Sequence, residues 1–210
     1  MRLLLMLSFC SAIAAASGAG MEAYRRGDVA EAARQFQAAA RAGDVHAQYN
    51  TAMLLLNGEG IARDDAVAAR WLRFAAESGS APAQFALGRL YELGRGVPRS
   101  LSEATRWFEL AARQGHIEAQ VNLATQYFLG RGAPLDMRRA ARWYERAAKG
   151  GDIGAQYIVA TLYERGDGVP RDLAQAWHWY RAAALQGDPA AAIRARALGQ
   201  RIVDRAQLPD

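Results

Sequence analysis

Apolar residues follow a helical period along most of the chain. Two segments show the pattern most clearly, at Ala104, Trp107, Phe108, Ala111 and Ala112, and again at Ala176, Trp179, Tyr180, Ala183 and Ala184. Spacings of three and four residues place each set on one broad face of a helix. Small alanines permit a close approach between helices, and the aromatic rings fill the gaps beside them. The pattern therefore predicts amphipathic helices that pack through Ala-rich faces.

The pattern returns every 36 residues. Its markers are a tryptophan, an Ala-Gln pair, a Gly-x-Gly turn, a pair of alanines and a closing glycine. The tryptophans are Trp71, Trp107, Trp143 and Trp179, and the closing glycines are Gly79, Gly115, Gly151 and Gly187. Independent markers that keep one register without a slip predict a repeat array.

Each repeat is predicted to hold two helices. The first begins after the closing glycine of the preceding repeat, where the N-cap residues are Asp44, Ser80, His116 and Asp152. It ends at the first glycine of Gly-x-Gly, which can adopt the left-handed conformation. The second helix begins at Asp64, Ser100, Asp136 and Asp172. Because no strand precedes the glycines and no Gly-Lys-Ser/Thr follows them, the turn is predicted to serve backbone geometry and not phosphate binding.

These signals divide the chain into four repeats, residues 44–79, 80–115, 116–151 and 152–187. Residues 20–43 form a half-repeat, in which Asp28 and Glu31 have the spacing of a capping box. Its first helix is reduced to a remnant at Met21–Arg26. Residues 188–210 carry a capping helix and a tail, with Asp188 as N-cap and Pro189 as the first helical residue. The predicted fold class is all-α.

Residues 1–19 differ from the rest of the chain. Arg2 is followed by an uncharged apolar run from Leu3 to Ala16 and then by small residues, which is the layout of a secretory signal peptide. Cys10 follows Phe9, where a lipoprotein signal requires a small residue, so lipidation is not favoured. We expect an exported chain, periplasmic or secreted, that has no cysteine and no integral membrane segment after signal removal.

Several motifs resemble those of Sel1-like repeats, which are relatives of the tetratricopeptide repeat. They include Ala83-Gln84-Phe85-Ala86-Leu87-Gly88, Leu90-Tyr91, Gly94-x-Gly96-Val97-Pro98 and Ala104-x-x-Trp107-Phe108. The resemblance implies a right-handed α-α superhelix, a solenoid of antiparallel helix pairs. It also implies an adaptor in protein complexes, often in bacterial envelopes. The third repeat departs from the pattern at Val121, Gln126 and Ala133, so we expect it to pack less tightly.

Stacked helix pairs that rotate slightly from one to the next leave an extended concave surface, suited to a peptide, a helix or another protein. Residues that vary at one register position of the first helices are candidates for recognition. These candidates are Asn50, Met53, Arg89, Glu92, Asn122 and Phe128. An Asn can hydrogen-bond a partner's backbone, and Arg89 can meet a carboxylate. The alternatives are that these are ordinary surface or inter-repeat residues, or that the convex face binds.

The charge pattern and the placement of reactive residues bear on which classes of function the sequence favours. The formal net charge is +5 and Lys149 is the only lysine, but arginines alternate with acidic residues, so nucleic-acid binding is not predicted. His46, His116 and His178 fall at three different register positions, which gives no metal-ligand spacing. No serine lies in a nucleophile elbow, and no motif indicates a cofactor. The sequence therefore predicts a binding protein and not an enzyme.

The predicted function is a protein–protein interaction scaffold, either of the bacterial cell envelope or secreted, that binds a protein or peptide. Two alternatives stay open. An envelope glycan-binding protein or hydrolase would place exposed aromatic rings and paired carboxylates in the groove. A secreted effector would bind a host protein by the same physics as the scaffold. Trp177 lies outside the tryptophan register and either meets a partner or packs against the C-terminal cap, and the sequence leaves the oligomeric state open.

Overall fold

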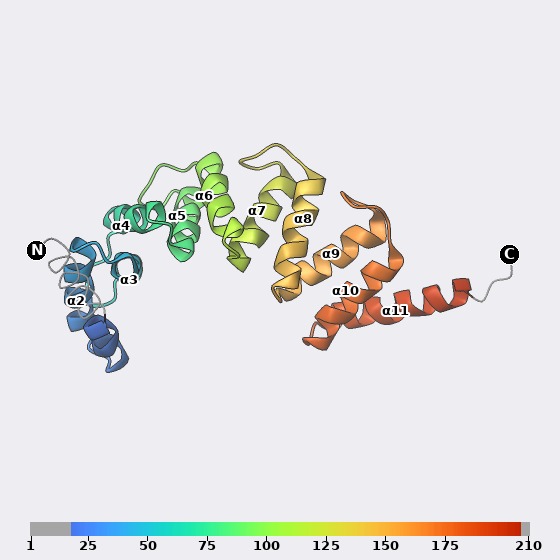
Figure 1. Ribbon diagram of the computed structural model, residues 1–210, viewed down its shortest axis with the longest axis horizontal. Coiled ribbons are helices and arrows are strands. Elements are labelled where there is room, and N and C mark those ends of the chain that lie inside the picture. Colours follow the sequence, from blue (N-terminus) through green and yellow to red (C-terminus); the bar gives the residue numbers. More distant parts are fainter. Residues whose placement is uncertain (1–17, 207–210) are drawn as a thin grey trace, which may run out of the picture. The chain divides into compact units, whose positions relative to one another are not determined.

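The computed structural model describes residues 18–206, and no strand occurs in this range. A helical stretch at residues 18–25, the N-terminal helix below, comes first (Figure 1). The helices that follow are α2 Val29–Arg41, α3 Val45–Asn57, α4 Asp65–Glu77, α5 Ala81–Leu93, α6 Leu101–Arg113, α7 Ile117–Leu129, α8 Met137–Lys149, α9 Ile153–Arg165, α10 Leu173–Leu185 and α11 Pro189–Ala206. The predicted all-α fold of helix pairs is confirmed. The predicted signal peptide, including Cys10, lies outside the described residues except for residues 18 and 19.

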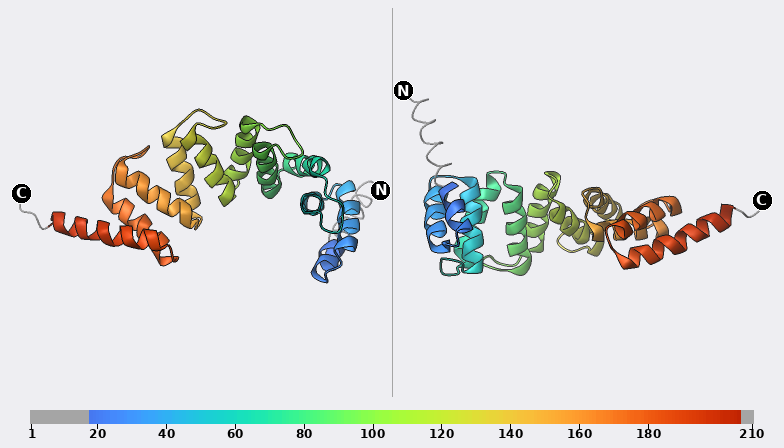
Figure 2. Two further views of the ribbon diagram at one scale, coloured as in Figure 1. Left: turned by 180° about the vertical axis from the view of Figure 1, so that it is seen from behind. Right: turned by 90° about the horizontal axis from the view of Figure 1, so that it is seen from below.

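The helices fall into two compact units, the first ending at Ala111 and the second beginning at Ala112. In the first unit, α2 packs against α3, α3 against α4, and α4 against α5. In the second unit, α7 to α11 pack in the same successive way, and Figure 2 shows α9, α10 and α11 side by side. Within each unit, these helices are therefore supported by their neighbours in sequence, as stacked repeats require.

The predicted caps close the first helix of each repeat. Backbone N–H groups three residues into the helix donate to the side chains of Asp44, Ser80, His116 and Asp152, at 2.8, 3.4, 3.3 and 2.6 Å. At the other end, the first glycine of each Gly-x-Gly turn is left-handed, with φ of 73°, 69°, 64° and 84° at Gly58, Gly94, Gly130 and Gly166. Both ends of the helix thus follow from the residue types that the repeat conserves in register.

The second glycine of the turn serves a different purpose, the packing of one repeat on the one before. Gly96 has φ +66°, and a Cβ placed on it would collide with the carbonyl oxygen of Asp65, at the start of α4. Gly60 and Gly168 meet the carbonyls of Val29 and Met137 in the same way. The Gly-x-Gly turn is therefore backbone geometry, as predicted, and its second residue permits direct backbone contact between successive repeats.

The Ala-Gln pair ties each first helix to the end of the preceding second helix. The alanine is fully buried in each repeat. The glutamine Nε2 donates to a carbonyl eight residues upstream, from Gln48, Gln84, Gln120 and Gln156 to Ala40, Ala76, Ala112 and Ala148, at 3.4, 3.0, 3.1 and 3.1 Å. These carbonyls lie in the last turn of a helix, and each also accepts the backbone N–H of the closing glycine three residues on. The glutamine adds a second hydrogen bond to the same acceptor, which joins the two helices.

The predicted packing face is buried. Trp107 is 4% exposed and Phe108 is fully buried, together with the alanines at 104, 111 and 112. In the third repeat, Gln126 occupies the core position that Leu90 holds in the second, with exposures of 4% and 3%. At the C-terminal end, Asp188 caps α11 as predicted and accepts from the Ala191 N–H at 2.9 Å.

One boundary differs from the prediction. The helix ahead of α2 is already formed at residue 18, whereas the sequence predicts a remnant that begins at Met21. Ala23 is buried, and a Cβ on Gly20 would lie 2.7 Å from the ring of Phe36. The absence of a side chain at Gly20 lets the helix lie directly on this ring, and that contact supports the longer helix.

Candidate functional site

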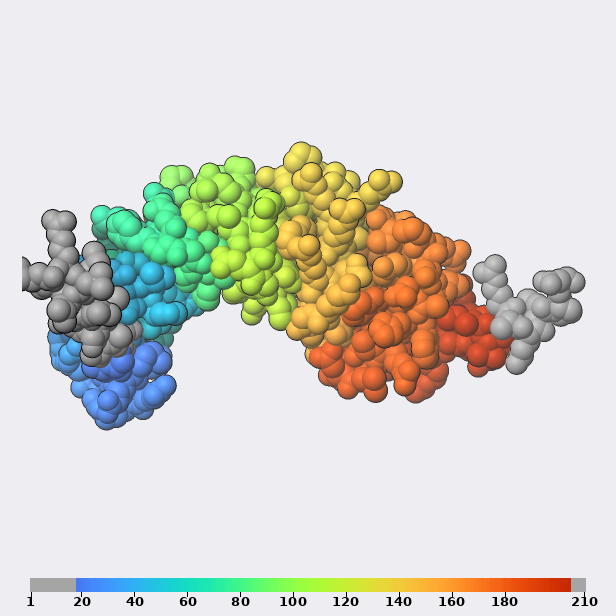
Figure 3. Space-filling view, in the orientation of Figure 1, coloured from blue at the N-terminus to red at the C-terminus, as the bar shows by residue number. Residues whose placement is uncertain are grey.

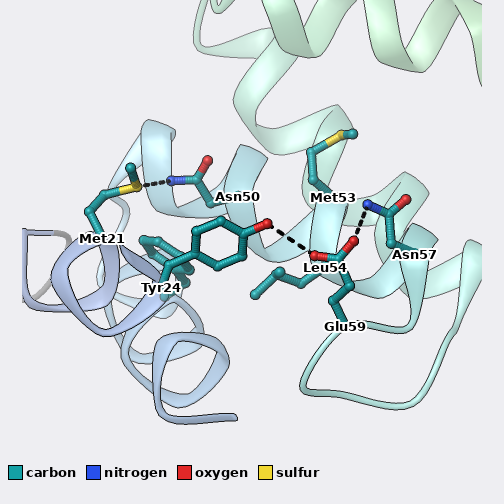
Figure 4. A pocket seen from close by; sticks show the side chains of 8 residues that line it. Met21, Tyr24, Asn50, Met53, Leu54, Asn57 and Glu59 are labelled. Atoms are coloured by element: carbon teal, nitrogen blue, oxygen red, sulfur yellow. Dashed lines mark hydrogen bonds between the residues drawn. The ribbon is translucent and has the colours of Figure 1, made fainter. Parts of the chain in front are cut away.

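A pocket of about 190 Å³ opens in the first unit, where the N-terminal helix faces α3 (Figure 4). It lies over α2 and is closed on one side by the turn that follows α3. The residues that line it are Met21, Tyr24, Phe36, Asn50, Met53, Leu54, Asn57 and Glu59. Four of them come from α3, so one helix supplies half of the lining.

The floor of the pocket is apolar and fixed. Phe36 is 2% exposed and Leu54 is 5% exposed, and both belong to the core of this unit. The thioethers of Met21 and Met53 flank the floor from opposite sides (Figure 4). Methionine has three rotatable bonds and a polarizable sulfur, so the walls can adapt to ligands of different shape.

The rim of the pocket is polar and hydrogen-bonded. The Tyr24 hydroxyl donates to Glu59 Oε2 at 3.1 Å, and Asn57 Nδ2 donates to Glu59 Oε1 at 2.9 Å. The hydrogen bond to Glu59 and the negative charge beside it raise the pKa of Tyr24, so its phenol stays a donor at neutral pH. The bond joins the N-terminal helix to the turn after α3 across the mouth of the pocket (Figure 4).

Asn50 is the weakest-held polar group of the rim. Its Nδ2 donates to the sulfur of Met21 at 3.8 Å. A thioether is a poor acceptor, so a ligand carbonyl that replaces it forms a stronger bond. Asn50 can therefore turn to a ligand at little cost.

The structure brings together two of the six predicted site residues, Asn50 and Met53, which both line the pocket. Arg89 and Glu92 pair with each other on α5 at 2.6 Å. On α7, the Asn122 side chain donates to the Glu118 carbonyl of its own helix at 2.7 Å, and Phe128 is 38% exposed. These four do not line the pocket.

The register position of Met53 varies for a structural reason in the second unit. There it holds Thr125 and Thr161, whose hydroxyls hydrogen-bond the phenols of Tyr144 and Tyr180 at 2.9 and 3.1 Å. In each of these two repeats, the threonine of the first helix thus hydrogen-bonds the tyrosine of the second helix. Variation at this position reflects packing within the helix pair.

Sequence reasoning missed Met21, Tyr24, Asn57 and Glu59. It treated the segment before α2 as a short remnant and not as a wall of a site. The available signal was Tyr24, which lies 36 residues before Gly60. It therefore occupies the register position that holds the second glycine of the turn in the four repeats. A tyrosine there removes the Gly-x-Gly turn and lets the helix continue to the edge of the pocket.

Three further observations apply to residues 18–206. Trp177 is partly buried beside Gly199 of α11, so it packs against the C-terminal helix. In this range no group of three or more His, Cys, Asp or Glu residues is placed to hold a metal ion. None of the helices described there has both the length and the apolar character needed to span a membrane.

Comparison with known proteins decides the family. The Sel1 repeat family model matches residues 45–80, 81–116, 117–152 and 153–188. The chain belongs to the Sel1 repeat family. Sel1 repeats generally mediate protein–protein interactions, and the Sel1 fold is a scaffold fold. Among curated proteins, none matches this Sel1 repeat chain.

Similar solved structures include the three that follow. A protective antigen of uropathogenic Escherichia coli with an SLR fold is 31% identical, with a TM-score of 0.84 over 87% of this chain and 40% of that one. A Sel1 repeat protein of Oxalobacter formigenes is 32% identical, with a TM-score of 0.76 over 81% of this chain and 50% of that one. The chain thus spans half or less of these relatives. A Sel1 repeat protein of Klebsiella pneumoniae, 20% identical, shares the fold with a TM-score of 0.54 over 89% and 93%.

Proposed function

We propose that this Sel1 repeat chain is an interaction scaffold whose pocket beside α3 holds an apolar side chain of a protein or peptide partner. The observation that carries the proposal is the combination of a buried apolar floor, Phe36 and Leu54, with a hydrogen-bonding rim. Peptide-binding sites use this combination because the apolar pocket supplies affinity and the polar groups orient the chain.

The rim offers donors and acceptors at the two ends of the pocket. Asn50 exchanges its weak bond to the Met21 sulfur for a backbone carbonyl of the peptide. At the other end, the carboxylate of Glu59 has its two oxygens held by Tyr24 and Asn57, which keeps an acceptor in place for a peptide N–H. A peptide held at both ends would place one side chain over the floor between Met21 and Met53.

The place of action is part of the same proposal. The signal-peptide pattern of residues 1–19 supports export to the periplasm or the medium. In that setting the partner is an envelope protein, or a host protein if the chain is secreted. The pocket offers the same apolar floor and hydrogen-bonding rim to either partner.

A glycan hydrolase is less well supported by the pocket. That alternative needs two carboxylates that flank a bond. Of the residues that line this pocket, only Glu59 carries a carboxylate, and both of its oxygens accept hydrogen bonds from neighbours.

Peptide selection tests the proposal. Random peptides displayed on phage are selected on the folded chain, and the affinity of the enriched peptides is measured by fluorescence anisotropy. Met53→Glu places a charge against the apolar floor and is expected to weaken binding by about tenfold or more. Tyr24→Ala, at a residue that is 43% exposed, is expected to weaken it as well.

The matched control is Ala66→Glu, which adds the same charge on an exposed position of α4. It should leave the affinity unchanged. Peptides that bind Met53→Glu and Tyr24→Ala as tightly as the parent chain would show that the pocket is not the binding site.

A further inference from the structure

Every exposed residue of helix α8 is a cation, while Glu145 is half-buried. Its exposed residues, called the basic face of α8 below, are Arg138, Arg139, Arg142, Arg146 and Lys149. The buried residues on the opposite side are Ala140, Ala141, Tyr144, Ala147 and Ala148. At helical spacing the five cations form one continuous strip along the whole helix. The residues between these cations are buried, apart from the half-buried Trp143 and Glu145, so the strip is not evident from the order of charges in the sequence.

The basic face is specific to the third repeat. The second helices of the other repeats expose mixed residues, which on α4 are Ala66, Arg70, Arg73, Phe74 and Glu77. On α10 they are Ala174, Gln175, His178, Arg181 and Leu185. The repeat fold therefore does not require five cations on the exposed face of its second helix. The like charges on α8 also repel each other, which lowers stability.

Two guanidinium groups of the face are held in place by aromatic rings. Arg146 lies over the ring of Trp143 at 4.5 Å. Arg139 lies over the ring of Tyr127 at 5.5 Å and donates to its hydroxyl at 3.4 Å. Stacking restricts the orientation of the guanidinium, so less entropy is lost when an anion binds.

Acidic neighbours neutralise the strip only in part. Lys149 pairs with Glu145 at 2.9 Å, and Arg139 with Asp136 at 3.3 Å. Within the described part of the chain, Arg138 and Arg142 form no ion pair.

An exposed leucine stands at the beginning of the basic face. Leu135, just before α8, is 63% exposed, and its Cβ lies 3.2 Å from the position of a Cβ on Gly130. Leu129, which ends α7, is 45% exposed. At the register position of Leu135, the other repeats carry Arg63, Arg99 and Arg171. Figure 3 shows this turn and the outer side of α8, in yellow, at the surface of the second unit.

We propose that the basic face of α8, together with Leu135, is a docking surface for an acidic segment of a partner protein. The segment would carry carboxylates along its length and an apolar side chain at the end that meets Leu135. Guanidinium groups bind carboxylates through two parallel hydrogen bonds, which rewards carboxylates at fixed positions. The stacked, fixed guanidiniums favour such a ligand over the mobile headgroups of an anionic membrane. This surface lies in the second unit and is independent of the pocket beside α3.

The probe for the test is a short fluorescein-labelled peptide with glutamates at i, i+4 spacing and one leucine at its end. Its affinity is measured by fluorescence anisotropy at low salt. The variant Arg138→Glu/Arg142→Glu/Arg146→Glu is compared with Arg25→Glu/Arg41→Glu/Arg70→Glu, which makes the same change of net charge at exposed positions of the first unit. The first variant is expected to bind about tenfold or more weakly than the second.

Equal weakening by the two variants would mean that the peptide senses only net charge, and would overturn the proposal. Arg138→Gln/Arg142→Gln, which removes charge without reversing it, serves if the triple variant does not fold, as judged by circular dichroism. This variant must also bind the peptide more weakly than the parent chain, or the surface is wrongly assigned.

Leu135→Arg separates a docking surface from simple charge attraction. It installs the residue type of the other repeats and adds a positive charge. The proposal expects weaker binding of the peptide because the apolar contact is lost, whereas charge attraction alone would give tighter binding. Vesicles of phosphatidylglycerol are the second probe. Binding of the basic face to these vesicles but not to the peptide would identify an anionic membrane as the ligand and overturn the proposal.

Discussion

At the scale of single residues, Gly96 carries a double constraint that Gly79 does not. Both have positive φ, +66° and +93°, but a Cβ would strike the backbone of Asp65 at Gly96 and would meet nothing within 4 Å at Gly79. Gly96→Ala is therefore expected to lower the free energy of unfolding by about 2–4 kcal/mol, against about 1 kcal/mol for Gly79→Ala. Urea denaturation followed by circular dichroism measures both. Equal losses would contradict direct backbone contact between repeats.

Asp65 links that same pair of repeats through charge. Arg95 and Arg63 each donate two hydrogen bonds to its carboxylate at 3.0 Å, and these bonds hold the pKa of Asp65 well below its usual range. Because the pKa is lower in the folded state than in the unfolded state, the stabilisation is present above the unfolded pKa and is lost as the pH falls through the folded one.

The expected result for Asp65→Asn is a loss of about 1 kcal/mol at neutral pH, a modest value because the arginines are partly solvated. This loss should shrink as the pH falls below about 4, where the parent carboxylate begins to protonate in the unfolded state. Denaturation curves of both proteins across the acidic range test it. A difference that stays constant down to the lowest pH would show that the ion pairs contribute nothing.

Trp107 tests the core directly. It is 4% exposed, so Trp107→Ala is expected to cost about 3–5 kcal/mol through the cavity that it leaves. Phe74, which is 53% exposed, gives the matched aromatic control, and Phe74→Ala is expected to cost about 1 kcal/mol or less. Thermal denaturation compares them, and similar midpoints would contradict the core role of Trp107.

At the scale of helices, α7 and α8 are coupled by the hydrogen bond between Thr125 and Tyr144. A double-mutant cycle with Thr125→Val and Tyr144→Phe is expected to give a coupling energy of about 0.5–1.5 kcal/mol. The equivalent register positions in the first unit carry Met53 and Leu72, which cannot form this hydrogen bond. A double-mutant cycle at these two residues should therefore give a coupling energy near zero. A zero value for the first cycle would mean that the bond contributes nothing to packing.

Helix boundaries could be predicted from the sequence because each depends on local chemistry. An Asp at 44, 64, 136 or 152 and a glycine at 58 or 94 satisfy the backbone within a few residues. The pocket could not be predicted in this way. Its wall depends on where the N-terminal helix lies against Phe36 and α3, and that contact joins segments that share no repeat marker.

The candidate residues show the same limit. Asn50 and Met53 were found because they vary in register, and both line the pocket. Arg89 and Asn122 vary as well, but one forms an ion pair on its own helix and the other bonds its own backbone. Variation at one register position therefore does not distinguish a ligand contact from a local contact or from packing within a helix pair.

At the scale of the whole molecule, one repeat design carries two different surfaces. The first unit holds the pocket, where the scaffold is apolar and the rim is neutral or acidic. The second unit holds the basic face of α8. Because stacked repeats are stabilised through neighbour contacts on buried faces, their solvent faces can diverge without loss of the fold. We propose that the scaffold uses these two surfaces for chemically different segments.

The most direct test of ligand binding uses the methionine methyl groups. Met21 and Met53 line the pocket, and Met137 lies in the second unit, so it serves as an internal reference. In a titration of the methyl-labelled chain with a phage-selected peptide, followed by NMR, the methyl resonances of Met21 and Met53 are predicted to shift while that of Met137 stays in place. Saturable binding with unchanged Met21 and Met53 resonances would contradict the assignment of the pocket.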